Sequence, residues 1–378
     1  MAIDQNPILP KDCTPDDSLR SPVFVTDIPE EALNHNRAFQ GIPAIERTQN
    51  GRIFYAFYTG TEDEGVGNFV ALFISDDEGK TMTEPYLCVM PSNPASCRVY
   101  DECLWLDPRG RLWFFVTQSY TYYDGRCGVW ACVCDDPDAE KPTFSPLRRI
   151  ANGIMMNKPI VYHDGTWLLP CAIWDKFKSS YNYIPEETYS NVYCSKDGGE
   201  TFSLLSHVDY PDRYIDEHMM VELKDGSILM LIRAKHGIGM AISEDGAKTW
   251  KKPVDSELGG PCARFCLKRL ASGRLLLVNH YNFKRRNNLT AMLSEDEGKM
   301  WKGFLLLDER QDVSYPDCAE DADGNLYIVY DRERYGAKEI LMAKIKEEDI
   351  LAGTVVTEGS YLKHVLNRAT GLPIGWSG

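Results

Sequence analysis

The segment "DEHMMVELKDGSILMLIR", residues 216–233, consists of two apolar stretches separated by the short polar sequence "KDGS". This pattern is typical of a β-hairpin whose turn contains a glycine. The segment also begins and finishes with polar groups, because its first residues are Asp216, Glu217 and His218 and its last residue is Arg233. The segment is therefore informative about the fold and is also a candidate for part of a functional site.

The same kind of hairpin occurs six times along the chain. The other five copies are "IPAIERTQNGRIFYAFY" from Ile42, "DECLWLDPRGRLWFFVTQ" from Asp101, "NKPIVYHDGTWLLPCAIW" from Asn157, "ARFCLKRLASGRLLLVNH" from Ala263 and "YPDCAEDADGNLYIVYDR" from Tyr315. The starting points of successive hairpins are 59, 56, 59, 47 and 52 residues apart. An interval of this length holds four short strands with their turns, which is the size of one β-propeller blade.

A second repeat lies between the hairpins. Its copies are "SDDEGKTM" (75–82), "SKDGGETF" (195–202), "SEDGAKTW" (243–250) and "SEDEGKMW" (294–301). In such a turn, the Ser and Asp side chains are expected to bond nearby backbone groups, the glycine to allow a positive φ, and the last bulky residue to pack underneath. We predict that these segments are structural turns rather than catalytic elements.

Together the two repeats predict an all-β protein, a six-bladed β-propeller of four-stranded antiparallel blades. We expect a single domain over residues 1–378, with the blades at about residues 40–353. The segment "SPVFVTDIP", residues 21–29, alternates like a strand, and we expect it to complete the last blade and close the ring. Because the first strand of each blade starts near the central axis, the residues that lead the six hairpins are expected to surround one pocket.

The composition limits the possible partners. A net charge of −15 disfavours nucleic acid and anionic membranes. The N-terminal sequence lacks the pattern of a signal peptide, and no segment approaches the roughly 18 apolar residues of a membrane span, so a soluble cytoplasmic protein is expected. The twelve cysteines include no C-x-x-C pair, and we expect reduced, mostly buried thiols, no metal site and no cofactor.

The four Ser-x-Asp turns resemble the Asp-boxes of the sialidase superfamily, and the six hairpins resemble its six-bladed propeller, over about residues 40–353. The resemblance implies roles for individual residues. Glu217, followed by "HMMVEL", "KDGS" and Arg233, is similar to the carboxylate that activates the family's tyrosine nucleophile, and Tyr315 is similar to that tyrosine. Such activation is needed because a phenol with a pKa of about 10 is otherwise protonated at neutral pH. Arg233 and Arg264 then resemble two members of an arginine trio that binds the sugar carboxylate.

The chain departs from the family pattern in one of these arginines. The sequence "QGIP" has Gly41 where the resemblance implies the first arginine of the trio. Losing one charge-assisted contact is expected to weaken binding of sialic acid by about 2 kcal/mol or more, with Arg37 as a candidate replacement. The family's general acid is an aspartate in the loop after the first hairpin, and Asp63 is its nearest match in "TGTEDEGVGN", beside Glu62 and Glu64.

A second group of candidates comes from "RVYDECLW", which contains Arg98, Asp101 and Glu102. A carboxylate pair formed by Asp101 or Glu102 with Glu217 would suit glycoside hydrolysis without a tyrosine nucleophile. Further residues are expected to complete the polar lining of the axial pocket. They are Lys158, His218, His236 and Asp317.

These observations predict an exo-acting glycoside hydrolase that removes a terminal acidic sugar from an oligosaccharide or small glycoside. The cations Arg98, Lys158, Arg233 and Arg264 favour an anionic substrate because they oppose the negative net charge of the chain. One alternative is a lyase acting on a uronic acid, with His218 or Tyr315 as base and acid. Another is a non-catalytic carbohydrate-binding propeller. The sequence gives no information about oligomeric state.

Overall fold

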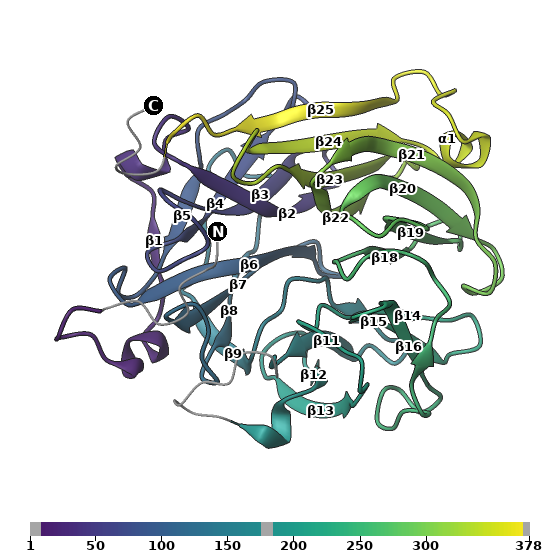
Figure 1. Cartoon of the computed structure of the whole chain (residues 1–378), viewed down its shortest axis with the longest axis horizontal. Coiled ribbons are helices and arrows are strands. Elements are labelled where there is room, and N and C mark those ends of the chain that lie inside the picture. The colour runs from purple at the N-terminus through teal and green to yellow at the C-terminus, as the bar shows by residue number, and fades with distance from the viewer. Residues whose placement is uncertain (1–8, 175–183, 373–378) are drawn as a thin grey trace.

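The structure of the chain, a computed structural model, describes residues 9–174 and 184–372. In this part the regular structure is almost entirely β-strand, arranged in six antiparallel sheets. Figure 1 shows that these sheets follow one another round a ring in chain order, so each sheet is one blade. The predicted all-β fold, a six-bladed β-propeller, is confirmed.

Each blade contains four strands that follow one another in sequence from its inner to its outer edge. Blade one contains β2 (Phe39–Arg47), β3 (Ile53–Gly60), β4 (Phe69–Ser75) and β5 (Leu87–Met90). Blade two contains β6 (Cys97–Leu106), β7 (Leu112–Tyr120), β8 (Gly128–Cys134) and β9 (Arg148–Asn152). Blade three contains β10 (Ile160–Val161), β11 (Trp167–Ala172), β12 (Ser190–Ser195) and β13 (Ser203–Val208).

The remaining blades repeat this order. Blade four contains β14 (Met219–Glu222), β15 (Ile228–Ala234), β16 (Gly237–Ser243) and β17 (Val254–Asp255). Blade five contains β18 (Cys266–Arg269), β19 (Leu275–Asn279), β20 (Asn287–Ser294) and β21 (Lys302–Gln311). Blade six contains β22 (Val313–Glu320), β23 (Leu326–Arg332), β24 (Glu339–Ile345) and β25 (Tyr361–Arg368). Helical segments are short: α1 (Glu347–Ala352) and the 3-10 turns Pro15–Leu19, Glu30–Ala32 and Pro185–Glu187. No helix in the described ranges is long and apolar enough to cross a membrane.

The prediction that residues 21–29 complete the last blade is wrong. Strand β1 (Val23–Val25) pairs antiparallel with β5 and adds a fifth strand to the outer edge of blade one. Blade six instead takes all four strands from the C-terminal part of the chain, because β25 follows α1 and extends the blade beyond residue 353. No strand of blade six is therefore left for the N-terminal segment to supply.

Contacts other than strand pairing join the first and last blades. Arg37, which precedes β2, is fully buried and donates a hydrogen bond of 2.8 Å to Oδ1 of Asn367 in β25. Gln40 donates one of 2.7 Å to the carbonyl of Lys338. Arg37 also bonds to Asn34 and Gln40. These buried bonds fasten blade one to blade six.

The repeated turns have the conformations expected from their sequences. The six hairpin glycines all have positive φ: Gly51, Gly110, Gly165, Gly226, Gly273 and Gly324. In each of the four Ser-x-Asp turns, the serine hydroxyl accepts a hydrogen bond from the backbone N–H four residues later, at 2.7–2.9 Å. The last residue of the turn packs against the core at Phe202, Trp250 and Trp301, but Met82 is 57% exposed.

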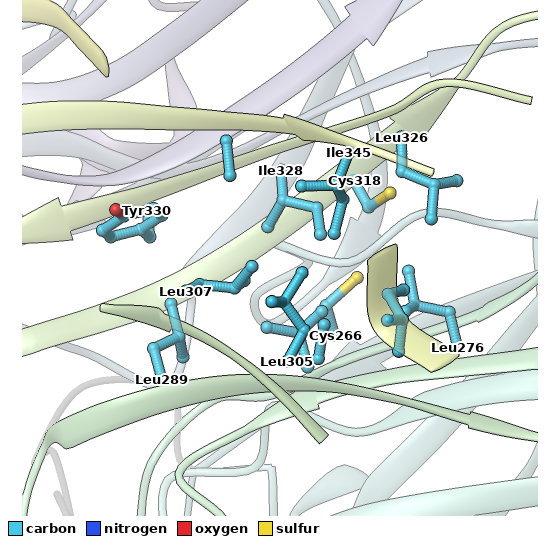
Figure 2. Close-up of a cluster of buried hydrophobic side chains, with 14 of the residues drawn as sticks. Cys266, Leu276, Leu289, Leu305, Leu307, Cys318, Leu326, Ile328, Tyr330 and Ile345 are labelled. Carbon is cyan, nitrogen blue, oxygen red and sulfur yellow. The ribbon is translucent and has the colours of Figure 1, made fainter. Parts of the chain in front are cut away.

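Apolar side chains fill the spaces between neighbouring blades. Between blades five and six, for example, Leu276 and Leu289 lie in one cluster with Ile328 and Ile345, and all four are fully buried (Figure 2). Both faces of a blade are covered in this way, so an inner strand such as β3 is buried along its whole length and is apolar on both faces. This explains why the hairpin sequences are apolar throughout instead of alternating.

Three of the innermost strands are bulged near the axis. Register shifts interrupt the pairing of β2 with β3, β6 with β7 and β22 with β23. At each shift one residue that is not glycine has a positive φ: 60° at Ile42, 50° at Asp101 and 56° at Tyr315. A bulge inserts a residue into one strand and redirects side chains, and a positive φ at a bulky residue is strained. The fold therefore holds Asp101 and Tyr315 in unusual conformations at corresponding places in two blades.

Candidate active site

Tyr315, Glu217 and Arg233 form one closely connected group. The hydroxyl of Tyr315 donates a hydrogen bond of 2.7 Å to Oε1 of Glu217. Nη1 of Arg233 lies 2.7 Å from Oε2 of Glu217 and donates a bond of 3.3 Å to the tyrosine oxygen. The side chains of Glu217 and Arg233 are 1% and 5% exposed. The structure thus brings together, from blades four and six, three residues that the sequence predicted to share a pocket.

The other two titratable residues that lead this hairpin face elsewhere. Glu217 lies two residues before β14 begins and reaches the tyrosine. Asp216 instead accepts a hydrogen bond of 2.8 Å from Ser190, and Nε2 of His218 bonds at 2.8 Å to the carbonyl of Asn191. Burial lowers the pKa of His218 to about 4, so its ring is neutral near pH 7. Successive side chains of an extended backbone point to opposite sides, which explains why Glu217 points differently from Asp216 and His218.

Two further arginines flank the ring of Tyr315. The guanidinium carbon of Arg334, in the β23–β24 turn, lies 4.2 Å from the ring centroid. That of Arg286, which precedes β20, lies 5.2 Å away. Arg286 is partly exposed, and within residues 9–174 and 184–372 its guanidinium has no carboxylate partner. Together with Arg233, three cations surround one phenol, which creates a site suited to an anionic ligand.

The protonation of Tyr315 reflects opposing influences. Burial raises the pKa of Tyr315, and the charge of Glu217 acts in the same direction, whereas Arg233, Arg286 and Arg334 lower it. The net direction is upward. In the ligand-free protein the phenol therefore keeps its proton and donates it in the hydrogen bond to Glu217, which is positioned to accept it.

Asp101 is a second acid beside this group. Its bulged backbone holds it at the inner end of blade two, where it is 2% exposed and its Oδ2 has no hydrogen-bond partner in the described residues. Burial raises the pKa of Asp101 to about 8, with the charges of Glu217 and Glu64 acting in the same direction and Arg98 opposing them. Asp101 is therefore protonated near neutral pH and is able to donate a proton.

Glu102 lies next to Asp101 but belongs to a different environment. It is fully enclosed, and neither carboxyl oxygen has a hydrogen-bond partner in the described part of the chain. Burial raises the pKa of Glu102 well above its usual range; the charges of Asp101 and Asp317 act in the same direction, and that of Arg264 opposes them. Glu102 is therefore a buried acid that is neutral near pH 7, and among the described residues it forms no hydrogen bond with the tyrosine group.

In the acidic loop after the first hairpin, Glu64 contacts the group around Tyr315, whereas the sequence spacing favoured Asp63. Asp63 is partly exposed, and its carbonyl accepts a bond from Asn68. The carboxylate of Glu64 lies 3.1 Å from Nη1 of Arg334. Of the loop acids, Glu64 is thus the one bonded to a cation beside Tyr315, although Asp63 was the closer match by position.

Arg264 and Arg98 are committed to the protein framework. Arg264 is 1% exposed and donates hydrogen bonds of 2.7 Å to Asn157 and 2.9 Å to the carbonyl of Met156, so it connects blades five and three. Among the described residues, Arg264 forms no hydrogen bond or ion pair with Tyr315. The family resemblance implied that Arg264 binds the sugar carboxylate, and that role stays a prediction. The guanidinium of Arg98 lies against the tyrosine rings at 3.7–5.7 Å: Tyr58, Tyr100 and Tyr122.

Lys158 and Asp317 form an ion pair with each other and not with the tyrosine group. Nζ of Lys158 is 3.2 Å from Asp317 and 2.5 Å from the carbonyl of Ile45. Both residues line a cavity of about 670 Å³ whose wall includes residues near the hairpin turns, such as Lys224 and Gly273. This cavity contains none of the tyrosine group. The expectation that Lys158 and Asp317 line the same pocket as Tyr315 is therefore not met.

Two remaining candidates also lie away from the tyrosine group. His236 sits in the β15–β16 turn, with Nδ1 2.7 Å from Asp212 and Nε2 3.3 Å from Asp255. Arg37 is enclosed in the contact between the first and last blades and does not replace the missing arginine. The space above Gly41 is instead crossed by Arg334, because a Cβ at residue 41 would lie 2.7 Å from its side chain.

The sequence reading missed Arg286 and Arg334, although a local signal was present. Both residues follow the second strand of a hairpin, as Arg233 does at the end of β15. The end of that strand lies beside the start of the first strand, so basic residues in "NFKRRNN" and "DRERYG" belong to the same end of the propeller as Tyr315. Arginines after each second strand were therefore reasonable candidates.

The chain is similar to known proteins over most of its length. A family model for the BNR repeat-like domain matches residues 36–328. A sialidase of Paraclostridium sordellii is 34% identical over 111 residues, which are 29% of this chain and 24% of that relative. The chain thus matches about a quarter of the length of this curated relative.

Solved structures of sialidases share the fold. The Hadza microbial sialidase Hz136 superposes with a TM-score of 0.62 at 19% identity, covering 77% of this chain and 63% of the other. A leech intramolecular trans-sialidase, solved with 2,7-anhydro-Neu5Ac, gives a TM-score of 0.65 at 14% identity, covering 85% and 69%. At these identities the likeness concerns the fold. The family match, the four Ser-x-Asp turns and the ring of six blades agree, and the protein belongs to the BNR repeat-like domain family.

Proposed function

We propose that this protein is an exo-acting glycoside hydrolase of the sialidase type, which removes a terminal acidic sugar from an oligosaccharide or small glycoside. The observation that supports it most directly is the hydrogen bond between Tyr315 and Glu217, with Arg233 within 2.7 Å of the same carboxylate. A phenol needs a base at hydrogen-bond distance to act as a nucleophile near neutral pH. The sialidases among the similar proteins support the same reaction class.

In the proposed reaction, Tyr315 attacks the anomeric carbon while its proton passes to Glu217. The bond to the leaving oxygen breaks, and that oxygen takes a proton from Asp101, the buried acid whose pKa of about 8 keeps it protonated. Water then displaces the tyrosine from the sugar, and the two protons return to the acid and the phenol. Two successive displacements restore the original anomeric configuration.

The cations around the phenol support an anionic substrate. Arg286 has no ion-pair partner in the described residues and lies 5.2 Å from the ring, so it is available to a ligand. A bidentate contact between a guanidinium and a sugar carboxylate would place the substrate over the phenol.

The experiment is a screen of the purified protein against aryl glycosides and oligosaccharides that end in sialic acids or uronic acids. We expect release of the terminal sugar by the wild type and none by Tyr315→Phe. Release of an unsaturated product that absorbs in the ultraviolet would establish lyase chemistry instead. Binding of the same sugars without turnover would assign the protein to the non-catalytic class.

A further inference from the structure

Arg334 occupies the space where a side chain at residue 41, in blade one, would lie. A Cβ built on Gly41 would lie 2.7 Å from Cγ, Cδ and Nε of Arg334. Real Cβ atoms do not approach other atoms so closely, so even an alanine at residue 41 would require Arg334 to move. The glycine and the arginine therefore depend on each other, although they come from opposite ends of the chain.

The inner side of Arg334 is fixed by the protein. Its Nε donates a hydrogen bond of 2.8 Å to Oδ2 of Asp331. Asp331 is fully buried and also accepts bonds of 2.8 Å from the backbone of Ile42 and 2.7 Å from Ser314. Burial alone would lower the pKa of Arg334, but Asp331 and Glu64 outweigh it and the arginine stays charged. The cation is thus held rigidly beside Tyr315.

The outer side of Arg334 contacts a second carboxylate, that of Glu64, which is partly exposed. Nη1 lies 3.1 Å from Oε1 of Glu64, in the loop between β3 and β4. The side chain of Glu64 is 15% exposed, whereas that of Asp331 is completely buried. Among the described residues, no other side chain donates a hydrogen bond to Glu64. Asp331 is therefore part of the framework, and Glu64 is a partner that a ligand is able to displace.

We propose that Arg334 selects an anionic sugar, and that without a ligand Glu64 occupies the place of the substrate's carboxylate. This inference rests on the proposed function for its substrate class. A sugar carboxylate exchanges with Glu64 for the outer face of Arg334, so the arginine never remains without an anionic partner. A neutral sugar has no group that replaces Glu64, and this difference excludes it.

The competing explanation is that the Glu64–Arg334 ion pair simply fastens two loops together. The two explanations differ in the effect of removing the carboxylate charge. If Glu64 competes with the ligand, Glu64→Gln strengthens the binding of an acidic sugar. If Glu64 only fastens the loop, the same substitution lowers the melting temperature and leaves affinity unchanged or weaker.

The test measures binding by calorimetry, with N-acetylneuraminic acid and D-glucuronic acid as probes, each compared with its methyl ester. We expect the wild type to bind at least one acid about tenfold more tightly than its ester. Glu64→Gln should bind that acid several times more tightly and the ester unchanged. Arg334→Met should bind acid and ester alike. Glu62→Gln, in the same loop but exposed, is the matched control and should equal the wild type.

Gly41→Ala provides a second route that keeps every charge. It should displace Arg334 and reduce the preference for the acid, and it remains informative if Arg334→Met does not fold. The proposal is overturned if neither acid is preferred to its ester, if Arg334→Met keeps the preference, or if Glu64→Gln binds the acid no more tightly. Because binding is measured, a protein that selects the acid but cleaves no glycoside would contradict the proposed hydrolysis alone.

Discussion

The hydroxyl of Tyr315 in blade six and the carboxylate of Glu217 in blade four are joined by a hydrogen bond of 2.7 Å, although 98 residues separate them in the chain. Their blades are not neighbours in the ring, because blade five lies between them. They meet because both project toward the axis. Tyr315 does so from a bulge at φ 56°, a conformation that the surrounding structure must hold in place.

The first prediction concerns this pair. Tyr315→Phe and Glu217→Gln should each lower kcat by several orders of magnitude, because one removes the nucleophilic oxygen and the other the group that accepts its proton. The double variant should be little worse than either single one, since the two residues act as a unit. Steady-state kinetics on the first active substrate would measure this. Tyr315→Phe with nearly wild-type turnover would end the tyrosine mechanism and favour a carboxylate pair.

The second prediction concerns the proton donor. Asp101→Asn should slow the cleavage of glycosides with poor leaving groups by about 10²–10⁴-fold, because their oxygen needs a proton. Activated aryl glycosides should be affected much less. Asp63→Asn serves as the control and should retain most activity, because Asp63 makes no side-chain contact with the tyrosine group in the described residues. An equal loss with both kinds of leaving group would contradict the assignment of Asp101.

The third prediction concerns stability and pH. The pKa of Asp101 is about 8 in the folded protein, whereas an aspartate in an unfolded chain has a pKa of about 4. Between these values the folded state binds the proton and the unfolded state does not, so the contribution of Asp101 to stability falls as the pH rises through this window. Asp101→Asn removes this dependence. Urea unfolding at pH 5 and pH 8, run on both proteins, should show the wild type losing more stability than the variant over that interval.

The fourth prediction concerns ring closure. Arg37 is fully buried between the first and last blades and bonds to Asn34, Gln40 and Asn367. Arg37→Met should lower the free energy of unfolding by about 2–4 kcal/mol, because hydrogen bonds to a charged group are lost and buried amides are left unpaired. Denaturant unfolding would measure the loss, and the exposed Lys252→Ala should change stability very little. A decrease of similar size in both variants would show that Arg37 has no special role.

The fold was largely readable from the sequence because its signals are local. A hairpin with a positive-φ glycine and a Ser-x-Asp turn that bonds to itself each need only a few consecutive residues, and both repeat in phase. The grouping of Glu217 with Arg233 was predictable for the same reason, since the two residues stand at the same end of one hairpin. The place of Tyr315 was implied by the family resemblance.

Other features were decided only by the tertiary structure. They depend on contacts between distant blades and on the position of each side chain along the propeller axis. The sequence could not show that β1 pairs with β5, that Lys158 lies in the cavity at the turn end, or that Glu64 rather than Asp63 bonds to Arg334. The sequence indicated only that Gly41 stands where an arginine was expected. In the structure, Arg334 crosses the space beside Gly41. Asp331, which holds Arg334, also accepts a hydrogen bond from the backbone of Ile42, 289 residues away in the chain. The physical reason is that a strand or turn depends on residues that are neighbours in the chain. The charge beside Tyr315 depends instead on side chains from several blades, which only the folded chain brings together.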